Sequence, residues 1–194
     1  MKNQKIMQLF ADALIPLLGF FWWNWSLYFI VLFYLLDYFS NEVFLHFKSK
    51  KIVAYQGVEK REWVKKGGLS FLLFVCAIFL IHLAMKSISP NIEFLKELIS
   101  FWNYKDMGIE QGYILLPLIA IVGYQRFKME FILPKKFQTV SLLEVWKPHL
   151  TGHLILIGFI AFVIGLSGFI ILPEAAYIIG IVIVSSVYQL TSAK

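Results

Sequence analysis

Six apolar runs, each close to the length of a membrane-spanning helix, constrain this chain more than any other feature of its sequence. A helix needs about 20 mostly apolar residues to cross the hydrocarbon core of a bilayer. The runs lie at residues 6–21, 25–47, 68–88, 110–127, 149–172 and 175–190. They lack the alternation of a membrane β-strand. The sequence therefore predicts an all-α polytopic membrane bundle of about six transmembrane helices, built as a single domain over residues 1–194.

The composition excludes a soluble protein and agrees with the apolar runs. Hydrophobic residues make up 59% of the chain and charged residues 15%, whereas a soluble domain has about 45–50% and about 25%. The net charge is +6, which in a soluble chain would indicate nucleic acid as a partner. Here the charges lie between apolar runs, so we expect contact with the lipid bilayer and none with nucleic acid.

Basic residues fall mostly on one side of the predicted membrane. If the N-terminus is cytoplasmic, all but three of the 18 Lys and Arg residues are on the inner side, the exceptions being Lys86, Lys96 and Lys105. This bias predicts that both termini are cytoplasmic, because basic loops remain inside. We expect the cytoplasmic membrane of a bacterium, with anionic headgroups against the basic segment 48–66.

Two segments outside the apolar runs have helical patterns. In the outer segment, Ser89 and Pro90 are typical of an N-cap and a first helical position. The apolar stripe that follows predicts an amphipathic helix at residues 90–104 in the outer interface; the stripe consists of Ile92, Leu95, Ile99 and Trp102. On the inner side, Ser141 and Glu144 have the spacing of a capping box. They predict a short interfacial helix that ends before Pro148.

A polar stripe in the second run is the first candidate site for a ligand or an ion. Asp37 is about ten residues from the inner end, or about 15 Å, which places it near the middle of the bilayer. A charge at that depth is costly, so it marks a functional position by default. Asn41 shares its face, Ser40 is adjacent, and Lys48 extends the stripe inward. The structural alternative is a carboxyl group that a neighbouring helix satisfies.

Two His-containing pairs form a second candidate, a metal site at the cytoplasmic face. His149 and His153 are four residues apart and therefore share one helix face, as do Glu42 and His46. Two imidazoles at this spacing can share one metal ion, and a carboxylate completes a set of three ligands. The four side chains converge only if the second and fifth runs are neighbours. A metal ion or a haem is one reading; the other is a group of interface histidines without a cofactor.

Small residues recur in the last two runs. Ala161 and Gly165 form one small-xxx-small pair, and Ala176 and Gly180 form another. Such pairs allow helix backbones to approach closely in a membrane. We expect packing within the bundle, with association of a second copy, or of a partner membrane protein, as the alternative.

Parts of the chain resemble an uncharacterised prokaryotic family of six-helix membrane proteins. The resemblance rests on the stretch Tyr34–Asp37 before a basic helix end, on His82, and on Pro148 followed by His153. A Tyr-Trp-x-Glu stretch occupies the first of these places in that family, so the second and fourth residues differ here. The resemblance implies six helices and no particular activity.

Two hypotheses about function follow from the sequence. The first is a small non-enzymatic membrane protein, an accessory subunit or a carrier of a small polar or ionic ligand that uses the Asp37 stripe. The second is a membrane-embedded metal- or haem-binding enzyme or redox protein that uses the His and Glu residues. We favour the first, because the segments between the runs are too short for a catalytic domain and the chain has no Walker loop or His-Glu-x-x-His motif.

Overall fold

The computed structural model describes residues 2–106, 109–170 and 172–192, which form helices joined by short connections and one short pair of strands. The helices are α1 (Lys2–Trp23), α2 (Leu27–Gln56), α3 (Lys60–Ile88), α4 (Phe94–Trp102), α5 (Gln111–Phe127), the π-helix η1 (Lys128–Ile132), α6 (Lys136–Thr139), α7 (Leu142–Ser167) and α8 (Glu174–Ser192). The two-residue strands β1 (Lys105–Asp106) and β2 (Ile109–Glu110) pair antiparallel. The predicted all-α class is confirmed.

Three helices in the described ranges are long and apolar enough to cross a membrane, namely α2, α3 and α7. The outward faces of α3 and α7 carry large apolar side chains such as Phe71, Phe79, Leu154 and Phe162, which are 58–66% exposed. A soluble monomer rarely exposes a continuous apolar surface of this kind. These helices therefore indicate an integral membrane protein.

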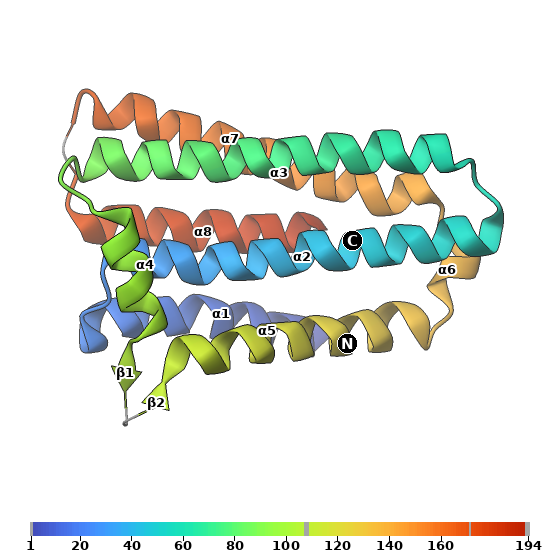
Figure 1. The fold of residues 1–194 in the computed structure, drawn as a ribbon, viewed down its shortest axis with the longest axis horizontal. Helices are drawn as coiled ribbons and strands as arrows, with labels where there is room; N and C mark the ends of the chain where they lie inside the picture. The colour runs from blue at the N-terminus through green and yellow to red at the C-terminus, as the bar shows by residue number, and fades with distance from the viewer. Residues whose placement is uncertain (1, 107–108, 171, 193–194) are drawn as a thin grey trace.

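The long helices run side by side along one axis (Figure 1). Helix α3 packs on α7, and α2 contacts α3, α5, α7 and α8. The connections after α1, α3 and α7 lie at the end of the bundle that α4 crosses, and those after α2 and α5 lie at the end that carries α6 (Figure 1). We call these the α4 end and the α6 end.

The basic segment 48–66 is mostly helical, which differs from the expected surface segment. Helix α2 continues to Gln56, where Gly57 caps it with a left-handed backbone (φ 68°) and an N–H bond to the carbonyl of Val53. Helix α3 begins at Lys60. With 30 and 29 residues, α2 and α3 are each about 45 Å long. This exceeds a hydrocarbon core of about 30 Å, so the extra turns carry the basic residues beyond the apolar part.

The helix expected at residues 90–104 begins later, at Phe94. Ser89 does not start it, because its N–H bonds to the carbonyl of Met85 and closes α3. Helix α4 packs on the bundle through Phe94 and the buried Phe101. Of the predicted stripe, Ile92 packs against the same cluster and Trp102 lies against the ring of Tyr113 on α5. In that stripe, Leu95 is 72% exposed.

The capping box of α7 is present, but the short helix predicted there is wrong. The hydroxyl of Ser141 accepts from the N–H of Glu144, and the carboxylate of Glu144 accepts from the N–H of Ser141. The helix then continues through Pro148 to Ser167. Proline removes one helical hydrogen bond, yet the buried Trp146 and His149 on either side of it hold the turn in place.

Three buried clusters follow one another from the α4 end towards the α6 end. The first is rich in aromatic residues around Trp25, Phe29 and Phe101. The second surrounds Tyr38 and Tyr188, and the third surrounds Trp146. The largest group of buried polar side chains lies between the second and the third.

Candidate metal centre

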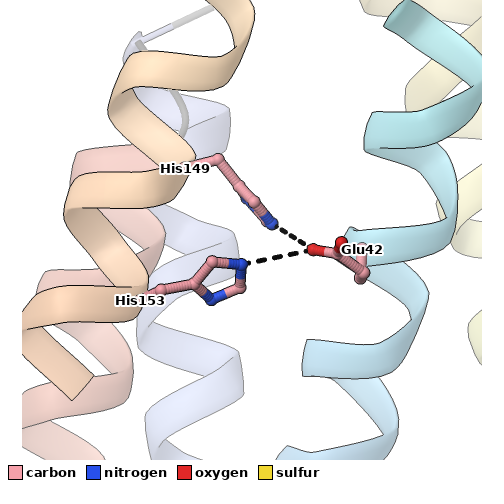
Figure 2. Close-up of side chains that lie close together, drawn as sticks. All are labelled: Glu42, His149 and His153. Carbon is pink, nitrogen blue, oxygen red and sulfur yellow. Dashed lines mark hydrogen bonds and ion pairs between the residues drawn. The ribbon is translucent and has the colours of Figure 1, made fainter. Parts of the chain in front are cut away.

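Helices α2 and α7 bring one glutamate and two histidines together in the interior of the bundle (Figure 2). The Nε2 atom of His149 lies 2.7 Å from Oε2 of Glu42, and the Nε2 atom of His153 lies 3.3 Å from the same oxygen. All three side chains are buried, with residue exposures of 0–4%. The expected convergence of the two helices is therefore present in the structure.

The three side chains are close enough together to hold one metal ion. One ligand atom from each of the three residues lies within 4.8 Å of the other two. The two imidazoles come from successive turns of α7 and point to one place (Figure 2). Two neutral His nitrogens and one carboxylate are a common ligand set for zinc. A buried carboxylate otherwise carries a large desolvation cost, which a bound cation offsets.

Two tyrosine hydroxyls lie beside the Nδ1 atoms of the two histidines. The hydroxyl of Tyr38 lies 2.5 Å from Nδ1 of His153, and the hydroxyl of Tyr188 lies 3.4 Å from Nδ1 of His149. Histidines that bind metals are usually oriented in this way, with the free nitrogen hydrogen-bonded to another group. In this arrangement both Nε2 atoms face the centre.

Sequence reasoning missed both tyrosines. Tyr38 precedes Glu42 by four residues, so helical spacing places the two on one face. Tyr188 has no such signal, because α8 reaches the centre only in the folded chain.

Ser70 and His46 complete the surroundings of Glu42. The hydroxyl of Ser70 donates to Oε2 of Glu42 at 3.0 Å and lies 3.1 Å from Nε2 of His153. The Nε2 atom of His46 lies 3.1 Å from the other carboxylate oxygen, and this side chain is 31% exposed. His46 therefore links the buried centre to the surface of the bundle. Ser70 had no signal in the sequence apart from its place in an apolar run.

The same contacts do not form a Ser-His-acid triad. A triad needs the serine on one imidazole nitrogen and the acid on the other. Here Ser70 and Glu42 both approach Nε2 of His153, whereas Nδ1 faces Tyr38. The geometry favours coordination over nucleophilic catalysis by Ser70.

None of the four residues of the polar stripe of α2 is among the three residues of this cluster. The amide of Asn41 donates to Oδ2 of the half-buried Asp37 at 3.1 Å. Ser40 is buried and lies beside the backbone of α5 at Gly123. Lys48 is half-buried, three turns further along α2 than Asp37. The structure therefore joins Asp37 to Asn41 and does not bring the four residues of the stripe to one point.

The small-residue pairs have different surroundings. Gly180 lies against the ring of Phe159 on α7, which a Cβ atom would approach to 3.2 Å, and Ala176 is half-buried. Ala161 and Gly165 lie on an exposed face of α7, where a Cβ atom at Gly165 would meet no atom within 4 Å. Close approach of helices is thus seen at α8 and not at Gly165.

Comparisons of the chain with protein-family models, with curated proteins and with solved structures find no match. The function of the cluster is therefore inferred from the residues of this chain alone.

Proposed function

We propose that this chain is a membrane-embedded metalloenzyme that binds one zinc ion through Glu42, His149 and His153. One observation carries the proposal: both imidazoles direct Nε2 at the same buried carboxylate oxygen. Tyrosine hydroxyls occupy the opposite nitrogens. This is the pattern of inner ligands and orienting partners found in protein metal sites.

The donor set and the space favour a compact ion over a haem. Nitrogen from two imidazoles together with one carboxylate suits zinc. The rings of His149 and His153 have centroids 4.4 Å apart on one helix face. They cannot sit on opposite faces of a porphyrin, and neighbouring helices fill the space around them.

Three protein ligands are the number found in catalytic zinc sites, where the remaining position holds an activated water for hydrolysis. The chain supplies two further groups at this point. Ser70 holds an oxygen of Glu42 and can orient a small molecule beside it. His46, the part-exposed neighbour of Glu42, provides a route for protons between the buried centre and the surface. A metal-assisted hydrolysis within the membrane is the reaction class that these roles support.

The proposed topology has six spans, with α1, α5 and α8 crossing beside α2, α3 and α7. Successive long helices run in opposite directions (Figure 1), and the basic residues gather towards the α6 end. We place that end in the cytoplasm under the positive-inside rule. The metal centre then lies in the inner half of the bundle, because His149 is seven residues, or about 10 Å, from the start of α7 at the α6 end.

A carrier or accessory protein that uses Asp37 is the second candidate function. It is supported by the position of Asp37 at the wall of a half-open cavity between the helices. The two candidates differ in what Asp37→Asn changes. A carrier that uses Asp37 loses its ligand-dependent stabilisation in this variant, whereas a metalloenzyme keeps its zinc.

The metal content of the purified full chain tests the main proposal. After expression with added zinc and removal of loosely bound ions, elemental analysis should find about one zinc per chain. Glu42→Gln and His149→Gln should each lower this ratio by about tenfold or more, because each removes one of three ligands.

His82→Gln is the matched control. His82 is also a histidine within the bundle, but it lies 3.0 Å from the hydroxyl of Tyr28 and 2.8 Å from the carbonyl of Ile78, away from the centre. This variant should retain zinc. Wild-type protein that is monodisperse and holds no stoichiometric metal would overturn the proposal, as would full zinc retention by Glu42→Gln.

A further inference from the structure

Among the described side chains that contact the carboxylate of Glu42, His46 has the greatest exposure. Its side chain is 31% exposed, whereas those of Glu42, His149 and His153 are 0–5% exposed. Ser70, the remaining contact of this carboxylate, is fully buried. An ion that approaches the cluster from the surface of the bundle therefore reaches His46 before it reaches the other groups.

The two oxygens of the Glu42 carboxylate have different partners. Oε1 lies 3.1 Å from Nε2 of His46. Oε2 lies 2.7 Å from Nε2 of His149 and 3.3 Å from Nε2 of His153. Carboxylates bind cations through one oxygen or through both. Glu42 therefore offers an outer pair of ligand atoms with His46 and an inner set with the two histidines of α7, and an ion can pass from one to the other while it stays bound to Glu42.

Polar groups continue from His46 along α2 and α3 towards the α6 end. His46 is ten residues before Gln56, the end of α2, a distance of about 15 Å. One turn beyond His46, the hydroxyl of Ser49 donates to the carbonyl of His46 at 3.0 Å and accepts from the indole N–H of Trp63 on α3 at 2.9 Å. These contacts place His46 on the side of the cluster that faces the charged end of the bundle.

The imidazole of His46 is held between α7 and α3. On α7, the ring of the fully buried Trp146 lies 5.3 Å from it between centroids, at an interplanar angle of 77°. On α3, a Cβ atom at Gly67 would lie 3.1 Å from Cε1 of His46, so the glycine leaves room for the ring. A ligand that is already held in position loses less conformational entropy when it binds.

We propose that His46 and Oε1 of Glu42 form an outer zinc site, through which the ion enters and leaves the inner site of Glu42, His149 and His153. The inference rests on the proposed metal function, because the outer site serves to load the inner one. Imidazole and carboxylate groups are both zinc ligands, and water completes the four positions that zinc prefers. The ion then exchanges His46 for the two imidazoles of α7 while Glu42 remains bound to it.

A site on the entry route affects the rates of zinc binding and release, and it leaves the affinity unchanged. Both directions cross the same barrier, whereas the affinity depends only on the free and bound states. A residue that only orients Glu42 has a different effect, because loss of such a partner lowers metal affinity by about 10–100-fold. Rates and affinity measured on one variant therefore separate the two roles.

His46→Gln in the full chain in detergent tests the proposal. The amide of glutamine retains a donor for Oε1 of Glu42, but it is not among the usual zinc ligands. Metal-free protein is mixed with zinc in a stopped-flow instrument, and uptake is followed by competition with a fluorescent chelator. Release is followed after addition of excess chelator. Both rates should fall by about tenfold or more, and the dissociation constant should remain that of the wild type.

His46→Cys and His82→Gln are the matched comparisons. A cysteine thiolate binds zinc, so His46→Cys should load zinc faster than His46→Gln, which a purely structural role of the imidazole does not predict. His82 contacts Tyr28 and the carbonyl of Ile78, away from the cluster, and His82→Gln should keep the wild-type rates. His46→Asn replaces His46→Gln if that variant does not elute as a folded species.

The possible results separate this proposal from the metal proposal. Wild-type rates of uptake and release in His46→Gln would overturn the outer site and leave the inner site in place. Weaker affinity caused by faster release alone would also overturn it, since His46 would then only orient Glu42. Wild-type protein that takes up no zinc would overturn the inner site, and the outer site with it.

Discussion

At the scale of the residue, Gly152 allows α8 to approach the cluster of Glu42, His149 and His153 closely. A Cβ atom at this position would lie 2.7 Å from Cε2 of Tyr188. The hydroxyl of the same tyrosine lies 3.4 Å from Nδ1 of His149. The missing side chain of Gly152 therefore leaves the space that the ring of Tyr188 occupies beside His149.

Replacing Gly152 by alanine should weaken zinc binding. The methyl group displaces the ring of Tyr188, and loss of such an orienting partner costs about 10–100-fold in metal affinity. Zinc affinity is measured by competition with a chelator of known strength. Gly158→Ala is the control, because a Cβ atom there meets no atom within 4 Å, and its affinity should not change. Equal affinities in the two variants would show that Tyr188 has no part in orienting His149.

At the scale of the element, the lengths of α2 and α3 depend on the turn between them. Gly57 has φ 68°, a left-handed backbone that side chains with a Cβ atom disfavour. Its N–H bonds to the carbonyl of Val53 and ends α2. Lys60 then starts α3 after a short connection. Gly57 thus divides the basic segment 48–66 between the end of α2 and the start of α3. Both helices therefore continue beyond the apolar runs of the sequence.

Gly57→Ala should destabilise the bundle by about 1–2 kcal/mol, the cost of a left-handed backbone in a residue with a side chain. The free energy of unfolding is measured in mixed micelles with a denaturing detergent. Gly68→Ala lies inside α3 with no atom within 4 Å of the added Cβ. It should stabilise the protein by up to about 1 kcal/mol, since alanine has the higher helix propensity. A Gly57→Ala protein as stable as Gly68→Ala would contradict this account of the turn.

At the scale of the whole molecule, the two ends of the bundle differ in charge and in covering. The α4 end is crossed by an apolar helix, which Ser26 fastens by donating to Glu97 at 2.9 Å. The α6 end carries the charged extensions of α2 and α3. We propose that this difference orients the chain in a membrane with the α6 end in the cytoplasm, because basic ends remain cytoplasmic.

Cysteine accessibility checks the proposed orientation. With Cys76, the only cysteine, replaced by serine, Glu59→Cys and Leu95→Cys place single thiols at the two ends. Both positions are exposed. A membrane-impermeant maleimide should label Leu95→Cys in intact cells and Glu59→Cys only after permeabilisation. The reverse pattern would invert the topology, and equal labelling of both in intact cells would show that α3 does not cross the membrane.

Much of the architecture was accessible from the sequence because it depends on local patterns. The length and apolarity of each run predict helices, and the capping box of Ser141 and Glu144 marks the start of α7. Helix ends were less accessible. Pro148 was expected to end a helix, and it does not, because packing around it outweighs one lost hydrogen bond.

The candidate site was also only partly predictable from the sequence. Helical spacing showed that His149 and His153 share a face, and that Glu42 shares a face with His46. No spacing within one helix shows which faces meet. Ser70 and Tyr188 join the centre from α3 and α8, elements that lie 28 and 146 residues further along the chain than Glu42.

The sequence by itself determined a helical chain with apolar runs, an uneven distribution of positive charge, and a small number of polar groups within apolar surroundings. These follow from how each side chain partitions between water and lipid, which is a property of single residues and short segments. Only the tertiary structure decided that α2 meets α7 at Glu42 and that tyrosine hydroxyls lie beside the two histidines of this cluster. Contacts between distant segments depend on the packing of whole helices against one another.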